Sequence, residues 1–279
     1  MTTFQKTVKY LAMAFALSLA ITILSAIITA IFSVIGAFGF LSFNYGNDNI
    51  KSTYSMQVEK GTVIDTLDID IDIADLKVIE GDTFKVEASN VSEKFKAEEV
   101  NNSLIIKEKG KTTSNLLFGN GTPKVTVYIP KNTVFKKATI ETGVGKTTID
   151  YLMSNEAKIK SGIGEFTIDN ITINSKVQIS GGVGKISINN SKLNNLKLET
   201  GVGETNISGE ITGNSTIKCG VGAVKIDIVG SRLDYNVNTE SGIGKVSVND
   251  ISKKESENKT PINDIKLEGG IGEMKLNFI

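Results

Sequence analysis

The stretch "ETGVGKTTID" at residues 141–150 has the residue types of a phosphate-binding loop, with two glycines followed by Lys146, Thr147 and Thr148. Such a loop holds phosphate oxygens with backbone N–H groups and the lysine, and a helix N-terminus behind it receives the negative charge. The motif requires G-x-x-x-x-G-K-[ST], and Ile140 stands where its first glycine is needed. We therefore expect neither phosphate nor nucleotide binding here.

Two further patterns could bind a cation. The stretches "GGVGKISIN" and "GGIGEMKLN" nearly match a calcium-binding nonapeptide, but Ile186 and Met274 occupy the position of its ligand aspartate. Asp68, Asp70 and Asp72 alternate with apolar residues, which places successive carboxylates about 7 Å apart on one face of a strand. They can share an ion only with help from another strand, so we predict a solvated acidic face. The alternative is a weak surface for a cation or a cationic partner.

The composition excludes several classes of function. The chain has no histidine, so it lacks the commonest general base and metal ligand. Its one cysteine, Cys219, cannot form an internal disulfide and stands at a position of small residues, which favours a buried structural thiol. Lysine plus arginine and aspartate plus glutamate number 31 each, which disfavours nucleic-acid binding. We predict no catalytic, cofactor-binding or metal-binding residue, and hence no enzyme.

The N-terminal part carries a long apolar run. No charged residue occurs from Tyr10 to Phe43, a length that exceeds the roughly 20 residues needed to cross a bilayer. We predict a transmembrane helix over residues 10–43, with a cleaved signal peptide as the alternative. Lys6 and Lys9 precede the run, so the positive-inside rule places residues 1–9 in the cytoplasm and the chain after residue 44 outside the cell.

A glycine pair separated by Val or Ile recurs seven times. The first glycines of the pairs are Gly143, Gly162, Gly182, Gly201, Gly220, Gly242 and Gly270. The spacing is 19 or 20 residues for the first five copies and 22 and 28 for the last two, where polar insertions such as "NDISKKESENKTPIND" read as exposed loops.

Neighbouring positions keep their residue types in all copies. The residue before the first glycine is small, and the sixth residue after it is Ile, Val or Leu, as at Ile149, Ile168 and Ile188. The residue after the second glycine is charged in six copies and Ala223 in one, which indicates solvent exposure. Apolar residues alternate on both sides, but the phase slips at the second glycine. Each repeat therefore predicts strand, glycine bend and strand.

These repeats predict an all-β fold with two possible architectures. In a parallel β-solenoid, about seven coils of 19–20 residues stack so that equivalent positions form columns. In an antiparallel meander, the second glycine and the Lys or Glu after it would instead form a two-residue hairpin turn. The near-constant repeat length favours the solenoid. We assign residues 44–62 to a linker, 63–136 to a less regular N-terminal β segment, and 137–279 to the repeat domain.

Together, the apolar N-terminal run, "LDIDIDIADLKVIEGDTFKVEA", "VTVYIPKNTVFKKATIETG" and the "TGVGKTTID" repeats resemble the DUF4097 family of adhesin-like bacterial proteins. The resemblance covers roughly residues 63–279. It implies a membrane-associated or surface protein rich in β-strand repeats, and some relatives are linked to envelope-stress responses. No catalytic residue follows from it.

The function expected from these observations is a membrane-anchored, outward-facing module that binds or scaffolds a protein or glycan of the bacterial cell envelope. A regulatory membrane protein that senses envelope stress is the alternative. A polysaccharide-cleaving enzyme is less favoured, since such enzymes use paired carboxylates and exposed aromatic residues, and the repeats contain few aromatic residues.

Overall fold

The computed structural model describes residues 50–108, 122–249 and 260–279 of the chain. The predicted cytoplasmic residues 1–9 and transmembrane helix 10–43 lie outside this part. No helix within the described ranges has the length and apolar character needed to cross a membrane. Residues 48–279 form a compact unit, and the buried apolar side chains of the described residues make one core within it.

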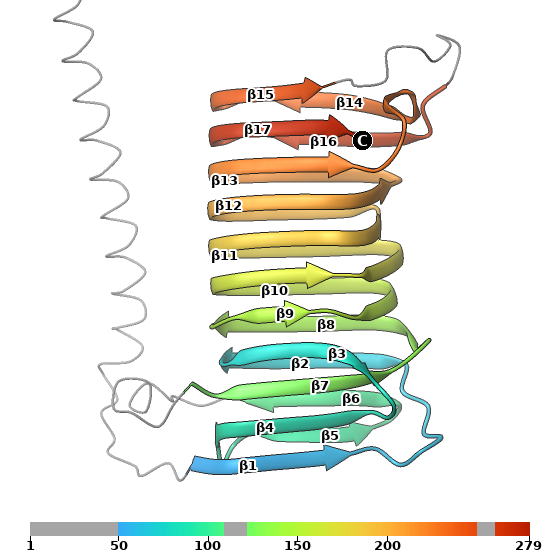
Figure 1. Cartoon of the computed structure of the whole chain (residues 1–279), viewed down its shortest axis with the longest axis vertical. Helices are drawn as coiled ribbons and strands as arrows, with labels where there is room; N and C mark the ends of the chain where they lie inside the picture. The colour runs from blue at the N-terminus through green and yellow to red at the C-terminus, as the bar shows by residue number, and fades with distance from the viewer. Residues whose placement is uncertain (1–49, 109–121, 250–259) are drawn as a thin grey trace, which may run out of the picture. The chain divides into compact units, whose positions relative to one another are not determined.

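The described residues contain one sheet of 17 strands and a short 3-10 helix (Figure 1). The strands of the first half are β1 (Ile50–Gln57), β2 (Thr66–Ile73), β3 (Asp75–Gly81), β4 (Lys85–Ser92), β5 (Lys96–Val100), β6 (Ser103–Glu108), β7 (Lys124–Pro130), β8 (Val134–Val144) and β9 (Thr147–Ile149). Those of the second half are β10 (Leu152–Asp169), β11 (Ile171–Asn194), β12 (Leu196–Thr212), β13 (Asn214–Ile228), β14 (Tyr235–Glu240), β15 (Ile243–Asn249), β16 (Asn263–Glu268) and β17 (Ile271–Phe278), with the helix η1 (Arg232–Asp234) before β14.

Successive repeats pair in parallel and in register, as a solenoid requires. Strand β10 pairs with β8 and β9 on one side and with β11 on the other, and β12 and β13 continue the stack. Ile140, Ile159 and Ile179 are direct partners in this register. The solenoid-like architecture is therefore confirmed. The hairpin meander is wrong, because it would pair the two halves of each repeat with each other in antiparallel fashion.

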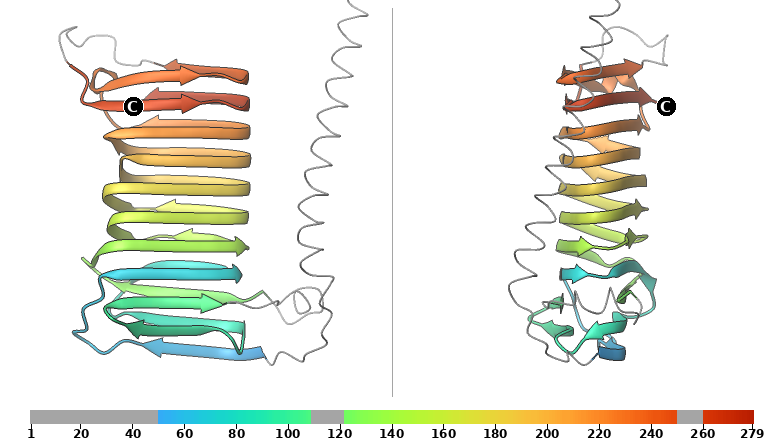
Figure 2. Two further views of the ribbon diagram at one scale, coloured as in Figure 1. Left: turned by 180° about the vertical axis from the view of Figure 1, so that it is seen from behind. Right: turned by 90° about the vertical axis from the view of Figure 1, so that its left-hand side faces the viewer.

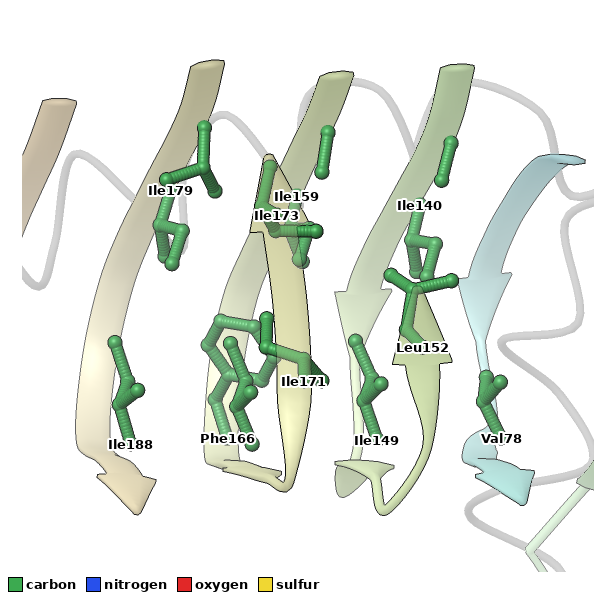
Figure 3. Packing of buried hydrophobic residues seen from close by; sticks show 14 of the residues in the cluster. Val78, Ile140, Ile149, Leu152, Ile159, Phe166, Ile171, Ile173, Ile179 and Ile188 are labelled. Carbon is green, nitrogen blue, oxygen red and sulfur yellow. The ribbon is translucent and has the colours of Figure 1, made fainter. Parts of the chain in front are cut away.

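Each coil bends at its glycine pair, so that the chain returns along a second layer of the stack (Figures 1 and 2). Apolar side chains of both layers point into the space between them, where Figure 3 shows Ile140, Ile159 and Ile179 from one layer and Ile149 and Ile188 from the other. All five are fully buried. The two-layer core follows from the alternation in the sequence, which continues on both sides of the bend.

The glycines are required at the bend because the backbones of successive coils approach closely there. A Cβ atom on Gly184 would lie 1.9 Å from the carbonyl oxygen of Gly164, and one on Gly182 would lie 2.2 Å from that of Gly162. The second glycine of every pair also has a positive φ, between 135° and 155°. Both conditions exclude a side chain, so the repeated motif is a structural requirement of stacking.

Residue size is matched across the bend within each coil. The small residue before the first glycine lies against the residue five positions later, in the opposite layer. Thr142 and Thr147 have their Oγ1 atoms 2.9 Å apart. Where Gly181 leaves more room, the side chain of Ile186 fills it, and a Cβ on that glycine would lie 2.2 Å from the isoleucine Cδ1. Small and large residues thus fill the core together.

The spatial order of the last two coils differs from their order in the sequence. Strands β16 and β17, the end of the chain, pair with β13 on one side and with β14 and β15 on the other. The coil of β14 and β15 therefore occupies the end of the stack (Figure 1). In a simple solenoid each repeat stacks on the next, which would leave the final "MKLNFI" at the uncovered end of the stack. The register instead buries Met274 and Leu276 inside the stack.

The N-terminal β segment continues the same sheet and core. Strands β2 and β3 pair in parallel with β8 and β9, and β8 crosses the predicted domain boundary at residues 136 and 137. Part of the predicted linker is a strand, since β1 pairs antiparallel with β4. Strands β4 and β5 also pair antiparallel, with β7 and β6. At the N-terminal end of the stack, antiparallel pairs therefore replace the parallel pairs of the repeats.

Replacing glycines by alanine tests the close approach at the bend. Gly184→Ala should lower the free energy of unfolding by about 3 kcal/mol or more, since overpacking adds to the cost of a positive φ. Gly61 is the matched control, because it also has a positive φ, of 95°, but nothing lies within 4 Å of its Cβ position. Gly61→Ala should cost about 1 kcal/mol. Denaturant unfolding of residues 48–279 measures both, and equal losses would contradict the stacking argument.

Candidate functional site

The structure places Lys146, the lysine of the phosphate-loop-like stretch, on the exposed surface of a glycine bend. Its backbone N–H donates to the Asp75 carboxylate at 3.0 Å, and its ammonium lies 3.0 Å from the Glu165 carboxylate. Strand β9 follows directly, and Thr147 is buried in the core. The arrangement is a strand corner whose lysine already has anionic partners.

The residues that follow the second glycine form a column along the bend, which we call the charge ladder. In spatial order its members are Lys146, Glu165, Lys185, Glu204, Ala223, Glu273 and Lys245. The sign alternates wherever two charged members are neighbours. Lys185 and Glu204 approach to 4.0 Å. Parallel stacking places equivalent residues about 4.8 Å apart, so like charges would repel each other.

The Val or Ile between the two glycines forms a second column beside the charge ladder. This aliphatic ridge consists of Val144, Ile163, Val183, Val202, Val221, Ile271 and Ile243. Its exposure increases toward the β15 end, to 51% at Ile271 and 76% at Ile243. The ridge is one side chain wide, and its members are direct register partners along the stack.

The outer surface of the first layer, which we call the charged face, consists largely of ion pairs. Glu141 lies 2.7 Å from the ammonium of Lys158 and 3.5 Å from that of Lys160. The hydrogen bond from Lys158 and the attraction of both lysines lower the pKa of the Glu141 carboxyl. Glu268 has a lowered pKa for the same reason, since Lys218 and Lys266 donate to it. At neutral pH the carboxylates of this face are therefore ionised and paired with neighbouring ammonium groups.

The charged face also contains an open hollow of about 440 Å³ beside the glycine column. Asp70, Asp72 and Glu141 line it together with Lys160. Asp70 and Glu141 are direct partners in the sheet, so a neighbouring strand does bring a third carboxylate close to the aspartates. Asp68 instead pairs with Lys107 at 3.1 Å. Within the described ranges, no group of three His, Cys, Asp or Glu residues has the geometry of a metal site.

The outer surface of the second layer, which we call the polar face, has a different chemistry. Its first column is Thr148, Thr167, Ser187, Asn206, Lys225, Lys275 and Ser247. Beside it lie Asp150, Asp169, Asn189, Ser208, Asp227, Asn277 and Asn249, a row that a register shift interrupts between Asn189 and Ser208. Amides link some of its rungs, since Asn189 donates to Asp169 at 2.9 Å and Asn277 to Asp227 at 2.6 Å. The result is an array of hydroxyl, amide, carboxylate and ammonium groups with the spacing of the strands.

The remaining residues singled out from the sequence lie in the core. Cys219 is a buried free thiol in the column of small residues. Ile186 and Met274, at the ligand position of the calcium-like stretches, are buried as well. From the repeats we predicted only that the residue after the second glycine is exposed to solvent. The alternation of Lys146, Glu165, Lys185 and Glu204 along the chain was the signal that could have indicated a ladder.

Comparisons with known proteins agree with this architecture. The model of the family described as Toastrack DUF4097 matches residues 64–268, more than half of the chain. The chain therefore belongs to this family. No curated protein matches the sequence.

The structures of three bacterial proteins match this chain at low identity. A candidate lipid-binding protein from Parabacteroides distasonis is 16% identical, with 83% of this chain and 98% of that chain covered and a TM-score of 0.46. A candidate adhesin from Bacteroides fragilis is 13% identical, with coverages of 83% and 98% and a TM-score of 0.41. A candidate cell adhesion protein from Clostridium sporogenes is 14% identical, with coverages of 83% and 100% and a TM-score of 0.35. At these values none of them bears on the function of this chain.

Two substitutions at the uncharged member test the charge ladder. Ala223 is the direct partner of Glu204 on one side and of Glu273 on the other. Ala223→Lys should stabilise the domain, whereas Ala223→Glu should destabilise it, with a difference of about 1 kcal/mol between the two. Denaturant unfolding in low salt measures this difference, which should shrink at 1 M salt. The same stability for both variants in low salt would show that the ladder has no energetic role.

Proposed function

We propose that this member of the Toastrack DUF4097 family is a membrane-anchored, outward-facing β-repeat module. Residues 10–43 would anchor it, residues 1–9 would lie in the cytoplasm, and the solenoid-like unit would bind or scaffold an envelope glycan or protein. The proposal includes no catalytic role and no cofactor. The apolar run and the two lysines before it support the anchor and its orientation.

The observation that carries the binding role is the polar face. Among the described residues, the hydroxyls of Thr148, Thr167 and Ser187 have no hydrogen-bond partner in the protein. On the charged face the recurring feature is instead the ion pair, as between Glu141 and Lys158 and between Glu268 and Lys218. The polar face has ion pairs as well, Lys77–Asp150 and Lys225–Asp227, beside its uncommitted hydroxyls. Such donors and acceptors can bind a polar ligand readily, because a hydrogen bond to the ligand then replaces a hydrogen bond to water and breaks none within the protein.

The geometry of the polar face favours an extended ligand over a small molecule. Small-molecule sites are usually concave and mostly apolar, whereas this face is a flat array with a constant rise of about 4.8 Å per coil. A polymer that runs along the stack can repeat the same contact at successive coils, and many weak contacts then add up to useful affinity. Polysaccharide strands and extended protein segments of the envelope both have this character.

Protease treatment of cells stripped of their wall tests the topology. Protease should digest the chain beyond residue 44 in intact cells, because the proposal places that part outside. An antibody to a C-terminal tag follows the digestion, and a cytoplasmic protein serves as the control for lysis. Protection of the C-terminal part until the membrane is opened would show that the proposed orientation is wrong.

Co-sedimentation with isolated cell envelopes of the producing organism tests the binding role. Residues 48–279 should bind, and the double variant Thr167→Lys/Ser187→Lys on the polar face should reduce the affinity at least about tenfold. The matched control, Gln178→Lys/Ser180→Lys, adds the same charge to the charged face and should retain binding.

Two results would contradict this proposal. Equal binding by both double variants would exclude the polar face as the site. A wild-type protein that does not bind envelopes, together with a deletion strain whose response to envelope-active antibiotics is altered, would favour the sensing function instead.

A further inference from the structure

We propose that the end of the stack formed by β14 and β15 pairs edge to edge with the same end of a second copy of the chain. This inference goes beyond the proposed function and does not depend on it, because it concerns the last coil and not the polar face. The paired units would form a closed, two-fold symmetric dimer.

The first observation is that both strands of the last coil have a free edge. Among the described residues, β14 pairs only with β16, and β15 pairs only with β17. Every internal coil has neighbours on both sides. The backbone N–H and C=O groups that point away from the stack therefore have no strand partner, and such an edge is a template for pairing with another strand.

The second observation is that the interior of the solenoid is open at this end. Val237, Val246 and Val248 point inward but are only half-buried. Their partners in the next coil, Ile265, Met274 and Leu276, are no more than 1% exposed. Thr239 takes the place of the leucine or isoleucine of the inner column and is exposed. The end thus combines apolar surface with one hydroxyl, which suits an interface that forms reversibly.

The third observation is that the inward positions of this edge carry neither the charges nor the prolines that prevent pairing. Natural edge strands are short, carry charges or proline, or are covered. At the opposite end, β5 has five residues, among them Lys96, Glu98 and Glu99. Strands β14 and β15 contain no proline, and their inward positions carry no charge. The two charged residues of β14 and β15, Glu240 and Lys245, lie at outward positions. At the opposite end, β1 is a second outer strand, which among the described residues pairs only with β4.

A second copy fits this end better than a single strand does. The end presents two edges, one in each layer, and a lone peptide strand would satisfy only one of them. The same end of a second copy presents two edges at the same separation. A two-fold axis brings both pairs together in antiparallel fashion and places the half-buried valines against each other. Because a two-fold contact uses the same end of both copies, it closes instead of forming a fibre.

The chain that follows β15 is chemically unsuited to cover this end. Residues 250–259, "DISKKESENK", contain three lysines, two glutamates and one aspartate, and a single apolar residue, Ile251. Such a segment cannot supply two strands with apolar inward positions.

Sedimentation equilibrium of residues 48–279 over a range of concentrations tests the proposal, since this unit has its own core. The wild type should be a dimer in equilibrium with monomer. Val246→Lys and Val237→Lys each place a charge at an inward position and should raise the dissociation constant of the dimer at least about tenfold. The neighbouring outward substitutions Ser247→Lys and Asn238→Lys should leave it nearly unchanged. Unfolding midpoints show whether each variant remains folded.

Two outcomes would overturn the proposal. A wild type that is monomeric at every concentration would mean that the end is covered by something other than a second copy. A dimer that resists both inward variants but dissociates in Val183→Lys would place the contact on the aliphatic ridge. Neither outcome affects envelope binding by the polar face, which the double variants above test separately.

Discussion

The close stacking of backbones at the glycine bend is the constraint on which the rest of the structure depends. Carbonyl oxygens of one coil occupy the space where a Cβ of the next coil would lie, as at Gly164 and Gly184. Because the coils cannot approach in this way with any side chain present, the glycine pair recurs in every repeat that stacks on another complete bend. Asp72 and Ala74 take the equivalent positions in the coil of β2 and β3, where Gly143 and Gly145 lie against their carbonyls.

Stacking in register converts each position of the repeat into a column with its own chemistry. Inward positions become columns of isoleucine and leucine, which supply most of the buried apolar surface. Exposed positions become ladders in which each residue has equivalents about 4.8 Å away on both sides. This spacing explains the alternation of lysine and glutamate on the bend, because a residue there is selected together with its neighbours in the stack.

The same geometry gives the two outer faces different capacities. On the charged face, carboxylates such as Glu141 and Glu268 have lowered pKa values because lysines donate to them. Their contribution to stability is present at neutral pH and is lost as the pH falls through those lowered values. The polar face keeps hydroxyl groups without partners, and it is therefore the surface on which we place the binding role. A flat ladder surface suits an extended ligand, which is consistent with a scaffold of the envelope.

Local alternation and the spacing of the glycines were enough to predict the repeat, the bend and the inward columns, because both are visible in one chain. They also indicated that Lys146 is exposed, because the equivalent residues of the other repeats are charged or small. The order of the last coils and the strand at residues 50–57 became evident only from the fold. The interior columns of the coils of β15 and β17 are both apolar, with Val248 and Leu276 at the same position. The pattern of apolar residues would therefore allow either the coil of β14 and β15 or the coil of β16 and β17 to stack on β13. The choice depends on contacts between distant segments, which periodicity along one chain does not record.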